Sequence, residues 1–492
     1  MTDSGLGSTS EGIDPDDLAT CLKVLKAAGS LAKEHPDSIA VQRASGQLFK
    51  DLKRSRRVAA RAARSEADRA VVAATATGSP ERIDDETAGL SLTTRTSGEF
   101  AGTLVRARPC YICKQRYTLV DAFYHQLCPD CAALNRSKRD ARTDLTGRRA
   151  LLTGGRAKIG MYIALRLLRD GAHTTITTRF PNDAIRRFSA MEDSDQWLHR
   201  LRIVGIDLRD PAQVVALADS VAAEGPLDIL INNAAQTVKR SPGSYSALID
   251  AEAESLQVGT MPDVTRLGRT SDAHPVSLAN SLASTAVGEV SGVDALTAEA
   301  VTSLALLAGS ATAERIEKGI AIDAGGLVPD LAETNSWIHT VDQVDPVELL
   351  EVQLCNSVAP FILVSRLREA MKASPSRRKY VVNVSAMEGQ FGRAYKGAGH
   401  PHTNMAKAAL NMLTRTSAGD MVSDGILMSA VDTGWITDER PHPTKMRLAD
   451  EGFHAPLDLV DGAARVYDPI VQGELGTDLY GQFLKDFSPS PW

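Results

Sequence analysis

The stretch from Arg148 to Phe180, RRALLTGGRAKIGMYIALRLLRDGAHTTITTRF, constrains the fold of this chain more than any other. A short apolar run, a turn rich in glycine, a helical stretch and a second apolar run predict strand, turn, helix and strand. Short apolar runs alternate with longer helical stretches through most of the remaining chain, which is typical of a parallel sheet covered by helices on both faces. The predicted fold class is therefore α/β, with a doubly wound parallel sheet.

The rest of the chain differs from this pattern in composition. Between the sheet segments, residues 237–345 are rich in Ala, Ser, Thr and Gly, and a loop of that length without structure is improbable in a compact domain. We therefore expect a large insertion there, near the mouth of the site. The predicted regions are a helical region (1–75), a linker (76–103), a cysteine module (104–146) and the α/β domain (147–492), interrupted by the insertion.

Four cysteines form two CxxC pairs in the sequence CYICKQRYTLVDAFYHQLCPDC. Four thiolates at this spacing suit a closed, tetrahedral, structural Zn²⁺ site, with a redox pair or an iron–sulfur cluster as alternatives. His125 is a conceivable replacement ligand, and the module is a conceivable surface for a protein partner. Cys21 and Cys355 are expected to be isolated, buried thiols. The predicted zinc ligands are Cys110, Cys113, Cys128 and Cys131.

The turn TGGRAKIG predicts a dinucleotide site. Its glycines permit a sharp bend, and the helix that follows offers its N-terminus to a pyrophosphate. A basic residue after the second strand, Arg179, suits a 2′-phosphate, so NADP is favoured over NAD. The nucleotide-binding residues predicted from the strand ends are Gly154, Arg156, Lys158, Ile159, Gly160, Arg179, Asp207, Leu208, Asn233 and Ala234.

The turn, NNAA at residues 232–235, Ser385, Lys407 and VDTGWIT at residues 431–437 occur in one order along the chain. Together they resemble the short-chain dehydrogenase/reductase family, over residues 148–236 and about 345–492. The resemblance implies a Rossmann-type fold, hydride transfer between a nicotinamide and a small alcohol or carbonyl substrate, and a homo-oligomer. It also implies catalytic roles for Asn356, Ser385 and Lys407, and nicotinamide contacts from Lys407, Thr433 and Gly434.

Two positions depart from the family pattern. Lys158 replaces the middle glycine of the turn, and Thr403 replaces the catalytic tyrosine. An aliphatic hydroxyl is a far weaker acid than a phenol, so Thr403 can orient a substrate oxygen but is a poor proton donor. The loop before it offers Tyr395, His400 and His402 as substitutes. The alternative interpretation is a weak or inactive NADP-binding sensor that engages a partner through the zinc module.

Charge and hydropathy limit the other function classes. The net charge is −6, from 61 acidic and 55 basic residues, which makes a nucleic acid an improbable general partner. The basic run from Lys50 to Arg64 fits a solvated helix face or a surface for an acidic partner. No apolar run long enough for a membrane span is evident, and the polar N-terminus is unlike a signal peptide. We therefore expect a cytoplasmic protein.

Overall fold

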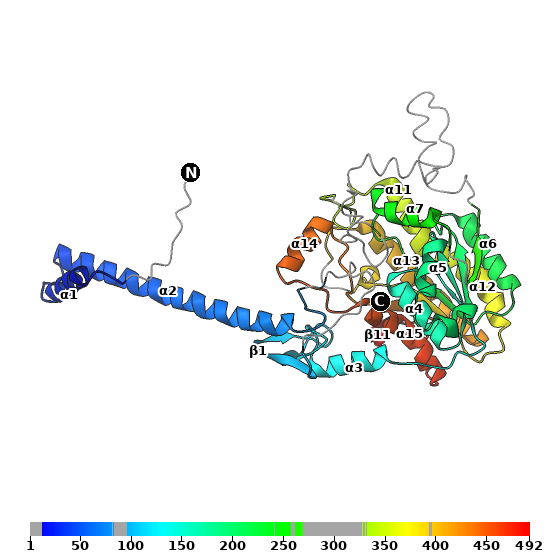
Figure 1. The fold of residues 1–492 in the computed structure, drawn as a ribbon, viewed down its shortest axis with the longest axis horizontal. Coiled ribbons are helices and arrows are strands. Elements are labelled where there is room, and N and C mark those ends of the chain that lie inside the picture. The colour runs from blue at the N-terminus through cyan, green and yellow to red at the C-terminus, as the bar shows by residue number, and fades with distance from the viewer. Residues whose placement is uncertain are drawn as a thin grey trace, which may run out of the picture. The chain divides into compact units, whose positions relative to one another are not determined.

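The C-terminal part of the chain is built on one large sheet, shown in the computed structural model of Figure 1. The structure describes residues 12–80, 82, 96–240, 242–256, 261–268, 327, 330, 332–392 and 396–492. In this part of the chain nine strands pair in the order β11-β10-β9-β8-β6-β3-β4-β5-β7. Every neighbouring pair is parallel except β10 and β11. The strands are β3 (Arg149–Leu152), β4 (His173–Thr178), β5 (Leu201–Gly205), β6 (Ile229–Asn232), β7 (Asp263–Arg266), β8 (Lys379–Ser385), β9 (Ile426–Asp432), β10 (Phe483–Lys485) and β11 (Ser488–Ser490).

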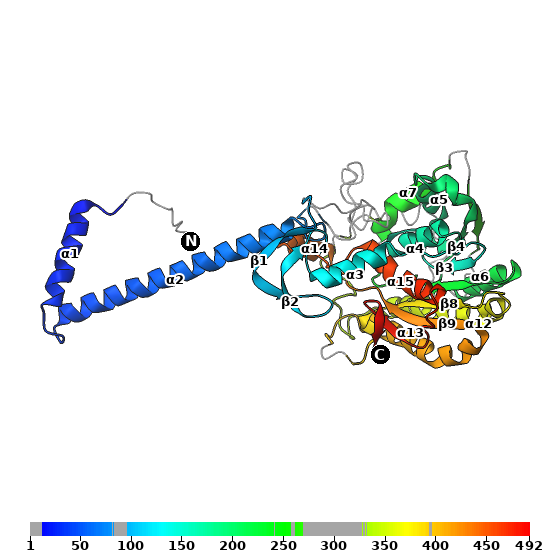
Figure 2. The ribbon, with the colours of Figure 1, turned by 90° about the horizontal axis from the view of Figure 1, so that it is seen from below.

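Helices cover both faces of this sheet (Figure 2), which confirms the predicted doubly wound α/β architecture. One apolar core joins the sheet to α4 (Lys158–Arg169), α5 (Pro181–Ser189) and α15 (Leu459–Glu474). A second core joins it to α6 (Pro211–Ala223), α12 (Ala359–Lys372) and α13 (Pro401–Met421). The buried strands are rich in Val, Ile and Leu, as expected for a sheet that is covered on two sides.

Part of the segment predicted as an insertion extends the sheet. Strand β7 pairs in parallel with β5, from Arg202 opposite Asp263 to Gly205 opposite Arg266. Helix α7 (Ser246–Ala253) packs beside α5, where the Glu252 carboxylate accepts hydrogen bonds from the backbone N–H groups of the first α5 turn. Residues 269–326 of the predicted insertion lie outside the described residues.

The cysteine module belongs to the same compact unit as the sheet, which spans residues 71–492. It consists of an antiparallel hairpin of β1 (Phe100–Pro109) and β2 (Arg116–Asp121), followed by α3 (Pro129–Arg139). Its buried Tyr124 and Leu127 share an apolar core with Ile436 and Leu457, from the connection between β9 and α15. The module is therefore packed against a loop of the α/β domain. That connection also contains α14 (His442–Asp450).

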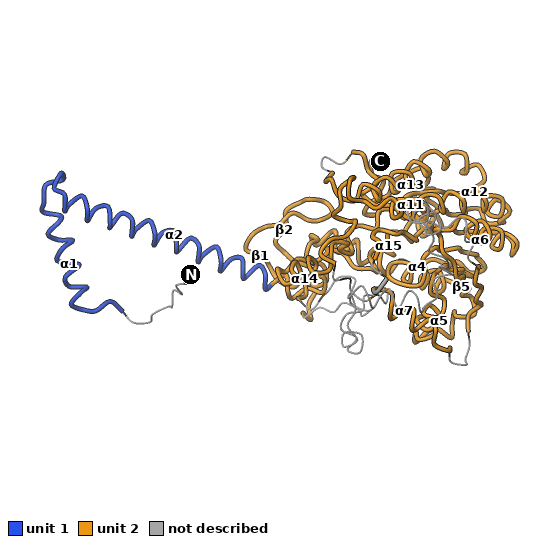
Figure 3. The backbone as a smooth tube through the Cα atoms, turned by 90° about the horizontal axis from the view of Figure 1, so that it is seen from above, with its two compact units in different colours: residues 1–70 blue, residues 71–492 orange. Residues whose placement is uncertain are grey.

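Residues 1–70 form a second unit, coloured separately in Figure 3. It contains α1 (Pro15–Gly29) and most of α2 (Pro36–Ala73), in agreement with the predicted N-terminal helical region. Five of the basic residues from Lys50 to Arg61 line one shallow surface hollow of α2. Cys21 is exposed on α1, so the expectation of a buried thiol was wrong there, because α1 has no buried residue at all.

One continuous helix, Pro346–Lys372, is the only one among the described residues that is long and apolar enough to cross a membrane. It comprises α11 (Pro346–Gln353), a π-helical turn at Leu354–Val358, and α12. The apolar window extends over these three consecutive helical segments, so it was not identified as one apolar run in the sequence. Leu363, Leu367 and Met371 lie in the core against the sheet, so burial accounts for one face of α12, while Phe361 on the same helix is exposed.

Candidate functional site

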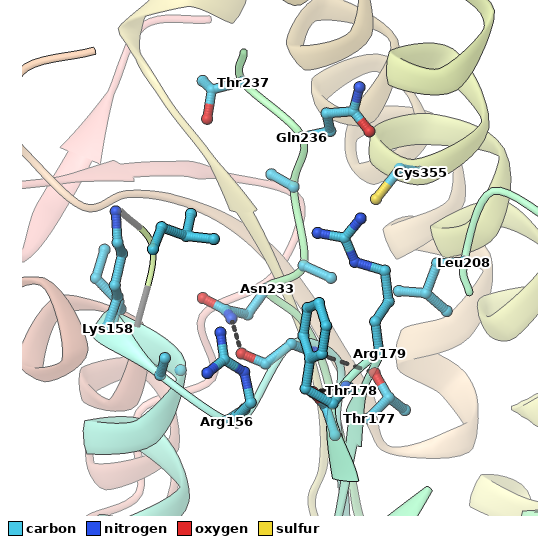
Figure 4. A pocket seen from close by; sticks show the side chains of 18 of the residues that line it. Arg156, Lys158, Thr177, Thr178, Arg179, Leu208, Asn233, Gln236, Thr237 and Cys355 are labelled. Carbon is cyan, nitrogen blue, oxygen red and sulfur yellow. Dashed lines mark hydrogen bonds between the residues drawn. The ribbon is translucent and has the colours of Figure 1, made fainter. Parts of the chain in front are cut away.

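A cavity of about 400 Å³ lies where the carboxyl ends of β3, β4, β5 and β6 meet (Figure 4). Ligand sites in doubly wound sheets lie at this edge. The cavity is lined by all ten residues that the strand ends and the turn predicted for nucleotide binding: Gly154, Arg156, Lys158, Ile159, Gly160, Arg179, Asp207, Leu208, Asn233 and Ala234. The structure therefore brings this predicted set together around one space.

A side chain has no room at Gly154, Gly155 or Gly160, in the turn between β3 and α4 and at the start of α4. Gly154 has a φ of +69°, and a Cβ there would lie 3.0 Å from the Cα of Ala234. A Cβ at Gly160 would lie 2.0 Å from the carbonyl oxygen of Gly154. The amide of Asn233 donates to the carbonyl oxygens of Thr153 and Gly154 at 3.0 and 3.1 Å, and so holds the bend. Helix α4 begins here with Ala157 as its N-cap, which has no side-chain acceptor. An N-terminus of this kind suits a phosphate group.

Lys158 occupies a backbone conformation that favours glycine. Its φ is +53°, in the left-handed region, where a side chain costs about 1 kcal/mol. Its side chain lines the cavity near the start of α4 (Figure 4). The chain therefore keeps the backbone shape of the usual glycine while placing a lysine at the edge of the cavity.

The far end of the cavity is formed by an arginine and two aromatic rings. Arg179 follows β4, and its Nη2 donates to the hydroxyl of Tyr245 at 3.4 Å. The rings of Phe180 and Tyr245 stack with centroids 6.1 Å apart. Burial raises the pKa of Tyr245, but the nearby guanidinium groups of Arg179, Arg240 and Arg209 together outweigh burial, and the net pKa is lowered. Figure 4 shows the Arg179 guanidinium directed toward Cys355 and Gln236.

Sequence reasoning missed several residues of this cavity wall, among them Tyr245, Cys355 and Arg209. Tyr245 comes from the segment predicted as an insertion, and Cys355, expected to be a buried thiol, is partly exposed beside Arg179. Arg209 pairs with Asp207 at 2.7 Å and with the buried Glu351 at 2.9 Å. The only sequence signal for Arg209 was its position two residues after Asp207, at the end of the third strand.

Asn356 fixes the loop that follows β6. It lies in the π-helical turn and is 1% exposed. Its Oδ1 accepts from the backbone N–H of Gln236 at 2.7 Å, and its Nδ2 donates to the carbonyl of Gln236 at 2.8 Å. Because Gln236 and Thr237 line the cavity, Asn356 shapes the cavity wall from behind.

Ser385 and Lys407 lie behind the cavity wall and bond to the protein itself. The Ser385 hydroxyl donates to Oδ1 of Asn411 at 2.5 Å, and the Lys407 ammonium donates to the carbonyl of Val384 at 2.8 Å. Burial lowers the pKa of Lys407 to about 8, while Glu388, the nearby Cys355 and Asp432 oppose this shift. Lys407, Thr433 and Gly434 lie outside the lining that the described residues give the cavity.

The candidate proton donors differ in how the structure presents them. Thr403 is 1% exposed, and its hydroxyl donates to the carbonyl of Thr237 at 3.4 Å. The buried His402 ring has its Nε2 3.9 Å from a Glu348 oxygen, and neither ring nitrogen has a hydrogen-bond partner among the described residues. Burial lowers the pKa of His402, against the opposing effect of Glu348. His400 stacks on Trp337 with ring centroids 4.0 Å apart. Tyr395 lies outside the described residues.

The four cysteine sulfurs of the module converge, all within 4.8 Å of one another. The Cys113 and Cys128 sulfurs are 3.6 Å apart. A tetrahedral Zn²⁺ with Zn–S bonds of about 2.3 Å places its sulfurs about 3.8 Å apart, so this donor set fits zinc. His125 bonds elsewhere, because its Nδ1 lies 2.8 Å from the Thr77 hydroxyl and its Nε2 lies 3.0 Å from the Gln126 amide.

With this geometry established, the comparisons with known proteins place the α/β domain. Residues 148–256 match the family model of the short chain dehydrogenases. The chain belongs to the short-chain dehydrogenase family. It is 30% identical over 380 residues, 74% of its length, to an uncharacterised protein of Acanthamoeba polyphaga mimivirus, and the match spans 71% of that protein. The family assignment also makes this an oxidoreductase-family protein.

Other similar proteins match smaller parts of the chain. A tropinone reductase homolog of Datura stramonium is 27% identical over 273 residues, which are 53% of this chain and 84% of that protein. A ketoacyl reductase of Nostoc sp. is 30% identical over 105 residues, which span only 36% of its own length. A short chain dehydrogenase of Burkholderia cenocepacia, solved in complex with NADP, is 19% identical, with a TM-score of 0.42 over 70% of this chain and 97% of that one.

Proposed function

We propose that this protein is an NADP-dependent oxidoreductase that transfers hydride between the nicotinamide and a small alcohol or carbonyl substrate. The observation that carries the proposal is the cavity itself. Its floor is the glycine-restricted turn at Gly154 and Gly160, one wall is the N-terminus of α4, and its far end carries Arg179. These are the groups that a bound pyrophosphate and a 2′-phosphate require. The nicotinamide, when bound, supplies or accepts the hydride.

The preference for NADP over NAD rests on Arg179. Its guanidinium lies against two aromatic rings, 5.1 Å from the Tyr245 centroid and 5.7 Å from that of Phe180. These contacts hold the planar group at the end of the cavity, where it can pair with a phosphate. Arg156, which lies in the turn between β3 and α4, is instead paired with Asp183. Arg179 is therefore the cation that we assign to the 2′-phosphate.

The proton-transfer groups are assigned by what each side chain can do. Lys407 is buried behind the wall formed by Cys355, where its positive charge orients groups at the nicotinamide end. Asn356 fixes the loop from Gln236 to Thr237, and Thr403 is hydrogen-bonded to that loop. Three proton sources remain to be distinguished: Tyr395, His402 and water. Ser385 acts through Asn411 as a positioning residue in this assignment.

The direct test is oxidation of NADPH by the purified protein with a panel of aldehydes and ketones. We expect turnover with at least one carbonyl compound, and a loss of turnover in Lys407→Met with NADPH binding retained. The variants Tyr395→Phe and His402→Gln then separate the proton sources, since loss of turnover in one alone identifies the donor. Binding of NADPH without turnover of any compound would contradict the enzyme proposal.

A second function, an NADP-binding sensor without turnover, is favoured by one specific observation. The Ser385 hydroxyl and the Lys407 ammonium both bond to protein atoms. In such a protein the cysteine module would engage a protein partner. Tight NADPH binding, with no turnover and no effect of Tyr395→Phe or His402→Gln, is the result that selects this function.

We further propose that the cysteine quartet binds one structural Zn²⁺. Its four thiolates leave no position for a water ligand, so we assign the metal a role in folding the hairpin and α3. Cysteines that bind a metal and form no disulfide are typical of a reducing compartment, and the cytoplasm is such a compartment. Metal analysis of the purified protein should find about one zinc per chain. A purified protein that contains no zinc would contradict this assignment.

We also propose that the protein forms a homo-oligomer through α12 and α13. Ser357, Val358, Phe361, Ala409 and Leu413 line a shallow, largely apolar hollow between these helices. Phe361 in this hollow is 58% exposed, and Met405 and Met412 on α13 are 57% and 54% exposed. Apolar side chains gathered on one face mark a surface for association. Phe361→Glu should convert the assembly to monomers in sedimentation, and an unchanged mass would contradict this interface.

A further inference from the structure

The connection between β9 and α15, residues 433–458, lies between the nucleotide cavity and the cysteine module. On one side, Thr437 and Glu439 line the cavity together with Leu459, the first residue of α15. On the other side, Ile436 and Leu457 belong to the apolar core of the module. The shape of this connection therefore depends on both neighbours.

Tyr111, in the first cysteine knuckle, holds the start of the connection. Its hydroxyl accepts a hydrogen bond from the backbone N–H of Trp435 at 2.9 Å. Its own backbone N–H donates to the carbonyl of Gln126 at 2.8 Å, which ties it to the second knuckle. Since Tyr111 lies between Cys110 and Cys113, the position of its hydroxyl is set by the geometry of the two knuckles.

Arg82 holds the end of the connection. The residue is 3% exposed, and its guanidinium donates to the carbonyls of Ala455 and Leu457 at 2.7 and 2.6 Å. It also donates to the carbonyl of Thr77 at 2.9 Å, and the Thr77 N–H donates to the carbonyl of Phe123 within the module. One buried cation thus joins the module to the loop through three backbone carbonyls.

A third set of contacts reaches the helix that follows. Arg139 of α3 pairs with Asp458 at 2.5 Å and with Asp461 at 3.0 Å. The Tyr124 hydroxyl donates to Asp461 at 2.6 Å. Ile159, from the nucleotide turn, packs against the same apolar core. The module therefore contacts the loop, the start of α15 and the nucleotide turn.

We propose that the cysteine module is a clamp that holds residues 433–458 in the shape that closes the nucleotide cavity, so that metal and nucleotide binding strengthen each other. Tyr111 and Arg82 are the positioning residues of this clamp. The inference rests on the proposed nicotinamide nucleotide site and goes beyond it. Coupling between two sites is reciprocal: if the metal favours nucleotide binding, the nucleotide must stabilise the metal site by the same factor.

The test measures how zinc partitions at equilibrium between the purified, zinc-loaded protein and a chromogenic chelator, with and without saturating NADPH. We expect NADPH to strengthen the zinc affinity about fivefold or more. Binding of NADPH is measured separately by its fluorescence. If NADPH binds and the zinc affinity is unchanged, the clamp is wrong while the proposed function stands. If NADPH does not bind, both fail.

Two tyrosines of the module provide a matched pair of variants. Tyr111→Phe removes the hydroxyl that contacts residue 435, whereas Tyr117→Phe removes one that donates to the carbonyl of His125, inside the module. With zinc content and circular dichroism unchanged, we expect Tyr111→Phe to weaken NADPH binding three- to tenfold and to reduce the effect of NADPH on zinc binding. Tyr117→Phe should keep the NADPH affinity and the effect of NADPH on zinc binding within twofold of the natural protein. Equal effects of the two variants would overturn the role of Tyr111.

Discussion

The two ends of the candidate site follow the family pattern to different degrees. At the phosphate end, the turn keeps the backbone that the family requires, including a left-handed conformation at Lys158, although a lysine has replaced the glycine. At the proposed proton-transfer end, the resemblance aligns Thr403 with the catalytic tyrosine, and the Ser385 hydroxyl is bonded to Asn411. Under the proposed function, the backbone geometry for nucleotide binding is therefore kept while the side chains for proton transfer differ.

The difference has a physical basis. A phosphate is bound by backbone N–H groups and a helix terminus, which tolerate many side chains as long as φ and close contacts are respected. Proton transfer needs a group of suitable pKa at one position, so a single substitution there changes the reaction.

Gly160→Ala should have the largest effect. Its Cβ would lie 2.0 Å from the carbonyl oxygen of Gly154, so the turn must open and the phosphate end must lose its shape. We expect NADPH affinity, measured by fluorescence titration, to fall at least about 100-fold. Gly419→Ala is the control, because nothing lies within 4 Å of a Cβ at that position and a helix favours alanine. Normal affinity in Gly160→Ala would refute the proposed phosphate end.

Arg179→Gln should separate the two nucleotides. Loss of a charge-assisted pair with the 2′-phosphate should weaken the binding of NADPH about 10- to 100-fold. The affinity for NADH should stay nearly unchanged. Competition titrations with both nucleotides measure this. Arg200→Gln, on a surface away from the cavity lining, serves as the control. If the affinities for NADPH and NADH fall equally, Arg179 stabilises the cavity and does not bind the 2′-phosphate.

Asp432→Asn should change how stability depends on pH. Asp432 is 3% exposed, and burial raises its pKa to about 6, against the N–H of Gly434 and the charge of Lys485. A raised pKa favours the folded state at low pH, and this contribution is lost as pH rises from about 4 through 6. The variant keeps the acceptor for Gly434, so its advantage over the natural protein should grow by about 2 to 3 kcal/mol across that window.

Urea unfolding at pH 4, 5, 6 and 7 measures this difference. Asp424→Asn, at a more exposed position, controls for the general effect of removing a carboxylate. If the free energies of unfolding of Asp432→Asn and the natural protein differ by the same amount at all four pH values, ionisation of the buried carboxyl does not destabilise the folded protein.

Thr403→Val should have the smallest effect. An aliphatic hydroxyl is too weak an acid to supply the proton, and valine has nearly the same shape in this buried position. We expect carbonyl turnover to stay within about threefold of the natural protein, since one neutral hydrogen bond contributes about 0.5 to 1.5 kcal/mol. A loss of several orders of magnitude would make Thr403 the acid and reverse the proposed contrast.

Local patterns in the sequence predicted much of the fold and of the phosphate end. The strand–turn–helix–strand of residues 148–180 is contiguous, so Gly154, Gly160 and Arg179 could be placed from spacing alone. Strand β7 could not be predicted, because Asp263–Arg266 shows no alternation of apolar and polar residues. This strand is stabilised by its pairing with β5. Tyr245 was missed for the same reason, since only the folded chain brings it to Arg179, 66 residues away.

The direction of a side chain at a strand end was also beyond the sequence. Neighbouring residues of a strand point to opposite faces, so an error of one position moves a hydroxyl from the cavity to the core. Ser385 was expected to have a catalytic role, and its hydroxyl donates a hydrogen bond to Asn411 of α13. The link between Tyr111 and Trp435 joins residues 324 positions apart and leaves no local pattern.

The central claim is that the cavity at the strand ends holds a nicotinamide nucleotide with a 2′-phosphate. Isothermal titration of the purified protein with NADPH and with NADH tests it most directly. The account predicts one site per chain for NADPH and a binding constant at least tenfold stronger than that for NADH. Heat signals that show no binding of either nucleotide would contradict the account.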